Sequence, residues 1–140
     1  MFRALSLFAA AALATLPVSA QQANTAITGV WLVEDGTAQV TIAPCGNQVC
    51  GRITRIIRAR PGSNGRDQNN PDPALRNRPI LGLSILSEMT RDGDVWRGKI
   101  YDPRGGKVYR SVVERDGTNR LSVKGCVSFI CKSQTWTRVS

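Results

Sequence analysis

The sequence contains no histidine, and this absence excludes several classes of enzyme. Without an imidazole the chain cannot form Ser-His-Asp or Cys-His nucleophilic machinery, or most catalytic zinc sites. Carboxylate pairs could still provide acid and base groups. However, six of the ten acidic residues lie in or beside expected turns: Glu34, Asp35, Asp92, Asp94, Asp102 and Asp116. We therefore expect a protein that is not an enzyme and that uses no cofactor or metal ion.

Aromatic residues are also scarce, at 6% of the chain, and the sequence carries no recognised nucleic-acid-binding motif. The chain is nevertheless basic, with 19 Lys and Arg against 10 Asp and Glu. A field of this sign suits anionic surfaces, phosphates or carboxylates. We expect no nucleic acid partner; an anionic envelope lipid, a protein partner or a small anionic ligand fits better. The alternative is that the positive charge only keeps the protein soluble.

Long apolar runs are absent except at the N-terminus. The run from Ala4 to Leu16 follows Arg3 and precedes the small residues Val18-Ser19-Ala20. This is the pattern of a cleaved secretory signal peptide, and the run is shorter than the roughly 20 residues that a membrane-spanning helix needs. The sequence thus predicts a signal peptide over residues 1–20 and one domain over 21–140 with a net charge of about +8. Its expected location is periplasmic or secreted, without a membrane span.

Four cysteines occur as two pairs with equal spacing, Cys45-x4-Cys50 and Cys126-x4-Cys131. In an oxidising compartment an even number of thiols indicates disulfides. Four cysteines allow three connectivities; we favour the two local pairs, because the turn signal Gly46-Asn47 brings its flanking cysteines together across a hairpin. Each short loop closed in this way would contribute about 2 kcal/mol. A four-cysteine zinc site is the alternative, but the spacing is loose for zinc.

Apolar and polar residues alternate along most of the chain after the signal peptide, and no long stretch keeps a helical period. Turn signals such as Asp92-Gly93 and Asp116-Gly117 separate the segments, so consecutive strands should form antiparallel hairpins. The sequence predicts an all-β fold, either a small antiparallel up-and-down barrel of about eight strands or a sandwich. The expected strands are Ile27–Val33, Thr37–Ala43, Val49–Ile57, Leu81–Leu86, Val95–Tyr101, Lys107–Glu114, Asn119–Lys124 and Gln134–Val139.

Two arginines interrupt the alternation on these strands. Arg55 has the same parity as Ile53 and Ile57, and Arg110 has the same parity as Val112. Either a β-bulge resets the register, or a cation points into the interior and binds the anionic group of a ligand. Both interpretations stay open, and Arg55 and Arg110 are candidate ligand-binding residues.

Two tryptophans lie on the first and last expected strands, which become neighbours when a barrel closes. Trp31 could then plug one end of the barrel together with Trp136, with Arg138 stacked on an indole face. The combination of Gly29-x-Trp31 with a late arginine resembles the calycin pattern of lipocalins and their relatives.

The segment RDQNNPDPALRNRPILG, from Arg66 to Gly82, crosses between two expected strands. Its acids crowd together but fail the EF-hand template, so a calcium loop is the least favoured of three interpretations. As the rim of a binding site, its Arg76 and Arg78 could hold an anionic ligand.

The third and favoured interpretation is structural. Asn70-Pro71-Asp72-Pro73 is rigid turn chemistry, in which Asn and Asp side chains bind nearby backbone amides. Asp67 and Asp72 would then pair with Arg76 and Arg78 and tie the segment down as a lid. In this interpretation Asp67, Asn70 and Asp72 are the structural residues of the loop.

A wider set of motifs resembles one family. In order, the chain carries Gly29-x-Trp31, Cys45-Gly46-x-x-Val49-Cys50-Gly51, Asp67-x-x-Asn70-Pro71-Asp72, Trp96-x-Gly98-x-Ile100-Tyr101-x-Pro103, Leu121-x-Val123-x-Gly125-Cys126 and Gln134-x-Trp136-Thr137-Arg138. This set resembles the DUF2147 family of small exported proteins of Gram-negative bacteria, to which no activity is assigned. The resemblance spans residues 21–140 almost entirely. It implies a periplasmic or secreted, lipocalin-like β-domain and brings no catalytic residues with it.

Two functional hypotheses follow. The first is an exported, non-enzymatic, lipocalin-like protein that holds a small apolar or anionic amphipathic ligand, with arginines near the mouth of the barrel. The alternative is an envelope structural or interaction protein whose barrel is filled by its own side chains and whose basic surface contacts a protein partner or a membrane. A cavity distinguishes the two.

Overall fold

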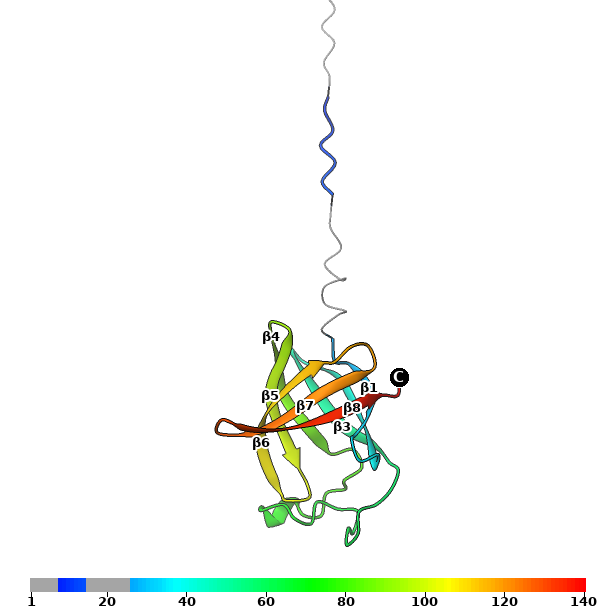
Figure 1. Cartoon of the computed structure of the whole chain (residues 1–140), viewed down its shortest axis with the longest axis vertical. Helices are drawn as coiled ribbons and strands as arrows, with labels where there is room; N and C mark the ends of the chain where they lie inside the picture. Colours follow the sequence, from blue (N-terminus) through cyan, green and yellow to red (C-terminus); the bar gives the residue numbers. More distant parts are fainter. Residues whose placement is uncertain (1–7, 15–25) are drawn as a thin grey trace, which may run out of the picture.

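The computed structural model describes residues 8–14 and 26–140. Within these ranges the chain forms a closed antiparallel barrel in which each strand pairs with its sequence neighbours and β1 pairs with β8 (Figure 1). This confirms the prediction of an all-β, up-and-down barrel. The strands are β1 (Gly29–Leu32), β2 (Ala38–Cys45), β3 (Gln48–Ile56), β4 (Ser84–Asp92), β5 (Val95–Asp102), β6 (Lys107–Arg115), β7 (Arg120–Val127) and β8 (Ile130–Arg138).

The predicted strand bounds are approximate, and those of β4 and β8 differ most from the structure; β4 also continues to Asp92, beyond the expected Leu86. β4 begins at Ser84, because Gly82 has a positive φ of 89° and interrupts the extended backbone before it. β8 begins at Ile130, four residues before the expected Gln134, because the disulfide-bonded residues Cys126 and Cys131 are also paired in the β7–β8 ladder. The expected cleavage site after Ala20 lies outside the described residues. Within the described ranges, no helix is long and apolar enough to cross a membrane.

The barrel interior is built from the alternate residues of its strands. On β6, for example, Ser111 and Val113 are buried, whereas Val108 and Arg110 are exposed. The buried apolar side chains form one cluster: Ile27, Trp31, Val40, Ile42, Val49, Ile53, Leu83, Ile85, Leu86, Met89, Val113, Leu121, Val123 and Trp136. Burial of this cluster is the main force that holds the sheet in its closed form.

The two arginines that break the alternation both lie outside the barrel. On β3, Gln39 pairs with Arg55 but Val40 pairs with Ile53, so a bulge at Thr54 turns Arg55 to the exposed face. Arg110 needs no bulge, because its whole parity set on β6 faces outward. Of the two interpretations left open, the bulge therefore applies to Arg55, and neither cation points into the interior.

A second bulge, on β4, depends on a glycine of the facing strand. Ser87 pairs with Lys99 and Thr90 with Arg97, so two β4 residues lie opposite the single residue Gly98. A Cβ atom at position 98 would lie 2.5 Å from the Met89 sulfur and 2.5 Å from the Ser87 carbonyl oxygen. Both distances are shorter than van der Waals contact, so only glycine fits.

Replacing Gly98 with alanine is therefore expected to lower the free energy of unfolding by about 2 kcal/mol, because β4 or β5 must shift. Gly125→Ala is the matched control, since a Cβ there would lie at an ordinary 3.6 Å from the Ile100 side chain. Urea denaturation of both variants measures the effect. Equal stabilities of the two variants would show that the bulge does not require a glycine.

Both disulfides are local and staple hairpins. Cys45–Cys50 joins β2 to β3, and Cys126–Cys131 joins β7 to β8. The favoured connectivity is confirmed, and the described residues contain no free cysteine.

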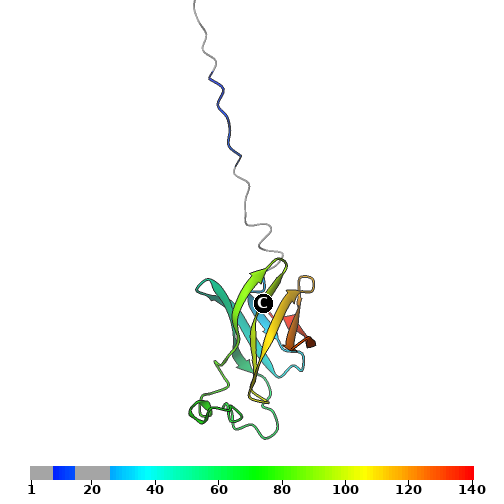
Figure 2. The ribbon, with the colours of Figure 1, turned by 90° about the vertical axis from the view of Figure 1, so that its left-hand side faces the viewer.

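The connections β1–β2, β3–β4 and β5–β6 lie at one end of the barrel, opposite the residues that precede β1 (Figures 1 and 2). The longest of them is the β3–β4 connection, which contains the short 3₁₀ helix η1 (Pro73–Leu75). It extends beyond this end and beside the β5–β6 turn (Figure 2). We call this the loop end, and the opposite end the closed end.

Candidate functional site

Trp31 and Arg138 seal the closed end of the barrel. The Trp31 side chain is fully buried, and its Nε1 donates a hydrogen bond to the Ile27 carbonyl oxygen at 2.9 Å. The Arg138 guanidinium carbon lies 4.4 Å from the centroid of the Trp31 ring, a cation–π contact. The two residues are also partners in the β1–β8 ladder. The arrangement expected for Trp31 and Arg138 is therefore present.

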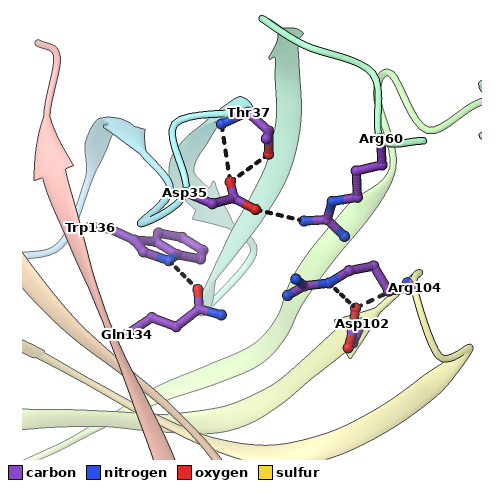
Figure 3. Close-up of polar contacts among 7 residues, drawn as sticks. All are labelled: Asp35, Thr37, Arg60, Asp102, Arg104, Gln134 and Trp136. Carbon is purple, nitrogen blue, oxygen red and sulfur yellow. Dashed lines mark hydrogen bonds and ion pairs between the residues drawn. The ribbon is translucent and has the colours of Figure 1, made fainter.

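Trp136 has a different place from the one expected. It is buried, but it lines the cavity described below rather than stacking beneath Arg138. Its Nε1 donates to Oε1 of Gln134 at 3.0 Å (Figure 3). Trp136 therefore belongs to the candidate binding site and not to the closure.

Arg115 is a second cation of the closed end, and the sequence analysis missed it. Its Nη1 donates to the Ala26 carbonyl at 2.8 Å, and its Nε and Nη2 donate to the carbonyls of Gly117 and Thr118, each at 3.0 Å. Burial, and then the nearby charge of Arg138, lower the pKa of Arg115. The arginine thus ties the segment before β1 to the β6–β7 turn. An arginine directly before Asp116-Gly117 was the available signal.

Asp67 is the centre of the β3–β4 connection. Its side chain is fully buried and accepts three hydrogen bonds, from the Tyr101 hydroxyl at 2.6 Å, Asn70 Nδ2 at 2.9 Å and Arg78 Nε at 2.8 Å. The Arg78 guanidinium also lies 5.5 Å from the Tyr101 ring centroid. The loop is therefore fastened to β5 through one carboxylate.

The charge state of this cluster follows from these contacts. Burial alone would raise the pKa of Asp67, but the donors Tyr101, Asn70 and Arg78 outweigh it and hold that pKa below its ordinary value. Burial and the adjacent carboxylate raise the pKa of Tyr101. At neutral pH Asp67 is therefore ionised and Tyr101 is a neutral donor.

The expected pairing of Asp72 with an arginine does not occur. Asp72 instead caps η1, where its Oδ1 accepts from the Ala74 amide at 3.0 Å. Arg76 donates through Nε to the Asn70 carbonyl oxygen at 2.7 Å. Of the ion pairs predicted for this loop, Asp67–Arg78 is present. Asp72 forms no such pair, because its carboxylate accepts a backbone hydrogen bond at the start of η1.

The loop also docks on the β5–β6 turn. Asn69 Nδ2 donates to the Arg104 carbonyl oxygen at 3.0 Å. Gly106, with a φ of 63°, lies so close to the Asn69 carbonyl that a Cβ at position 106 would collide with it. The β3–β4 connection is thus held at one rim of the loop end.

A cavity of about 980 Å³ opens at the loop end. Its deeper walls are apolar and come from six strands: Val40, Ile53, Ile85, Ile100, Val123 and Trp136. Its rim includes five basic side chains, Arg58, Arg60, Arg66, Arg104 and Lys132, and three acidic ones, Glu34, Asp35 and Asp102. An apolar interior below a net positive mouth is the arrangement that an amphipathic anion requires.

Two arginines face each other across this mouth, each with one carboxylate partner (Figure 3). Arg60 Nη2 lies 3.5 Å from Asp35 Oδ2, and Arg104 Nε lies 3.3 Å from Asp102 Oδ1. All four side chains keep a third to a half of their surface exposed, so a ligand can reach them.

Electrostatic coupling between the two arginines is visible in the pKa shifts at the mouth. Burial, and then the charge of Arg104, lower the pKa of Arg60 despite its partner Asp35. Burial alone would raise the pKa of Asp35, but hydrogen bonds from Thr37 and the charges of Arg60 and Arg104 lower it overall. Asp35 thus balances part of the positive charge, and the repulsion between the arginines that remains would be relieved by a bound anion.

The candidate ligand-binding residues from the sequence do not line this cavity. Arg55 and Arg110 are on the outer face, while Arg76 and Arg78 hold the β3–β4 connection together. Other arginines line the cavity, and two of them, Arg60 and Arg104, face each other at its mouth. The sequence signal for Arg104 was its place in Pro103-Arg104-Gly105-Gly106, a turn between two strands; only the closure of the barrel brings this turn opposite Arg60.

The described residues contain no group of three or more His, Cys, Asp or Glu side chains that could hold a metal ion. The arginines of the mouth offer charge pairing and hydrogen bonds to an anion above the apolar cavity.

The closed barrel, with its Trp31–Arg138 seal and its open cavity, has a lipocalin-like fold. The chain belongs to the DUF2147 family, described as an uncharacterized protein conserved in bacteria, whose model matches residues 29–138. Among solved structures, protein HP1028 from the human pathogen Helicobacter pylori, described as belonging to the lipocalin family, is similar. It shares 23% identity with a TM-score of 0.72, and the match covers 82% of this chain and 84% of that chain. This likeness shows the fold and confirms the lipocalin-like prediction. No curated protein matches the sequence significantly.

Proposed function

We propose that this protein is a non-enzymatic binding protein that acts outside the cytoplasm and holds one small amphipathic anion. The apolar tail of the ligand occupies the barrel cavity, and its carboxylate or phosphate group lies between Arg60 and Arg104. The observation that carries the proposal is the position of these two facing cations directly above an apolar cavity of about 980 Å³. Both local disulfides and the family support a location outside the cytoplasm.

The energetics favour an amphipath over a purely polar anion. Burying an alkyl chain contributes about 0.8 kcal/mol per CH₂ group, and the walls at Ile85, Ile100 and Trp136 supply the apolar surface. A guanidinium pair adds charge-assisted hydrogen bonds to the head group. The anion displaces no buried partner, since Asp35 and Asp102 stay solvated when their arginines turn toward the ligand.

The cavity also bears on the alternative function. A barrel filled by its own side chains would leave no such volume beside Val40, Ile53 and Val123. The envelope-structural alternative has no comparable observation in its favour at this end of the barrel, so the binding protein is the function that we propose.

A titration with cis-parinaric acid, a fluorescent fatty acid with a carboxylate and an apolar chain, tests the proposal. Arg60→Ala and Arg104→Ala are each expected to weaken binding about tenfold, since each removes one charge-assisted contact. Arg55→Ala is the matched control: it removes an arginine from the outer face and should leave the affinity unchanged.

A long-chain alcohol separates the head-group contribution from the apolar one. The alcohol should displace the probe with equal affinity from the original protein and from both mouth variants, because it carries no charge. Failure of the original protein to bind cis-parinaric acid, or equal binding by Arg104→Ala, would overturn the assignment of the mouth.

A further inference from the structure

The tip of the β7–β8 hairpin is an exposed apolar turn. Phe129 is 90% exposed, Ile130 64% and Val127 61%. Turns are usually built from polar residues and glycine, because their side chains lie in water. Here the two central residues are Ser128 and Phe129, between the paired residues Val127 and Ile130. The exposure of a phenylalanine at this place has no structural benefit for the barrel itself.

The tip is held rigidly. The Cys126–Cys131 disulfide closes the hairpin immediately behind it. Arg110 of β6 donates to the Ser128 carbonyl oxygen and supports the turn from the side. Figure 1 shows the tip projecting sideways from the barrel, clear of the neighbouring strands. A fixed, protruding group loses little conformational entropy when it inserts into another phase.

The β7–β8 hairpin contains basic residues and no acidic residue. Lys132 is the basic residue of the hairpin next to the tip, whereas Arg120 and Lys124 form ion pairs with Asp116 and Glu114, and Arg138 lies at the closed end. Arg110 adds a further cation at the turn, and Lys132 follows Ile130 by two residues. Val108, 61% exposed on the outer face of β6, extends the apolar surface toward this cation. Apolar side chains surrounded by cations are typical of groups that insert shallowly into an anionic lipid surface.

We propose that this hairpin tip docks the protein on an anionic lipid surface, with Phe129 and Ile130 inserted among the lipid head groups and Arg110 and Lys132 in contact with their phosphates. A second copy of the chain is a poorer occupant, because a stable protein interface buries about 800 Å² on each partner and a four-residue protrusion offers much less. A lipid surface needs no such area, since each inserted apolar group and each nearby cation contributes separately. Val127, Ile130 and Lys132 also line the cavity, whereas Phe129 does not, so the contribution of Phe129 to docking can be measured apart from ligand binding.

Vesicle flotation tests the docking. The protein should bind vesicles made of equal parts phosphatidylglycerol and phosphatidylcholine, should not bind phosphatidylcholine alone, and should dissociate as salt is raised. The tip variant Phe129→Ser is expected to bind the anionic vesicles about tenfold more weakly, because it removes the most exposed of the inserted groups. Val139→Ser is the matched control, since Val139 is 49% exposed but lies beyond the end of β8 that is remote from the tip. Its vesicle binding should equal that of the original protein.

Three results would overturn the inference. The first is that the original protein fails to float with anionic vesicles. The second is that the tip variant binds the vesicles as strongly as the original protein. The third is a dimer in sedimentation that the tip variant no longer forms, which would make the tip a contact with a second copy of the chain. The test is separate from that of the cavity, because Phe129 does not line it: Phe129→Ser should keep its affinity for cis-parinaric acid, and Arg60→Ala should keep its vesicle binding. Thermal melting should be equal for all variants, because every replaced apolar side chain is exposed.

Discussion

Replacing Asp67 with alanine is expected to lower the free energy of unfolding by about 3 kcal/mol, because three buried or half-buried donors lose one shared acceptor. The Tyr101 hydroxyl, Asn70 Nδ2 and Arg78 Nε all donate to this carboxylate, whose side chain is fully buried. Arg78 would also lose its ion pair with Asp67 while it stays beside the Tyr101 ring. Urea denaturation measures the global effect, and amide hydrogen exchange of residues 62–80 shows whether the loop opens before the barrel.

Asp72→Ala is the matched control for this loop. Asp72 caps a single 3₁₀ turn at the surface, so its loss should cost about 1 kcal/mol or less. Equal losses from Asp67→Ala and Asp72→Ala, with unchanged exchange rates in the loop, would contradict the central role of Asp67.

The contribution of Asp67 should also depend on pH. Its pKa in the folded protein is lowered, so the carboxylate stabilises the fold fully above its unfolded pKa of about 3.9, and this stability is lost as the pH falls through the folded pKa. The difference in stability between the original protein and Asp67→Asn should therefore be constant near neutral pH and shrink below about pH 4. A difference that grows on acidification would contradict the lowered pKa.

Replacing Trp31 with alanine is expected to cost about 4 kcal/mol, the second large effect, because it leaves a cavity where a fully buried indole closes the barrel. The same change removes the hydrogen bond to Ile27 and the surface on which Arg138 lies. Arg138→Ala, which keeps the indole, should cost about 1 kcal/mol. Thermal and urea unfolding distinguish the two, and a Trp31→Ala protein as stable as Arg138→Ala would show that the closed end does not limit stability.

The sequence predicted the barrel well because its signals are local. Alternation and turn residues place eight strands in a meander, and a cysteine pair five residues apart across a turn signal has a ready local partner. The Trp31–Arg138 contact was predictable for a related reason, since closure makes the first and last strands neighbours. Such features need no knowledge of how distant loops lie.

The binding site was not predictable in the same way. Parity left open whether Arg55 points inward or a bulge turns it outward, and the bulge at Thr54 turns it outward. Arg76 and Arg78 were noticeable because they lie in a segment rich in basic residues. In the structure they donate hydrogen bonds within that same segment, to Asn70 and Asp67, and so do not line the cavity. Arg60 and Arg104 are 44 positions apart and meet only through the three-dimensional path of the β3–β4 connection and the β5–β6 turn. A contact between two residues so far apart in the sequence leaves no periodic pattern that a single sequence could reveal.

A crystal structure of the protein with dodecanoate would show directly whether the cavity holds an amphipathic anion. We predict a carboxylate between the guanidinium groups of Arg60 and Arg104, with the alkyl chain extending into the barrel toward Trp136. An empty cavity at saturating dodecanoate, or a chain bound elsewhere on the surface, would contradict it.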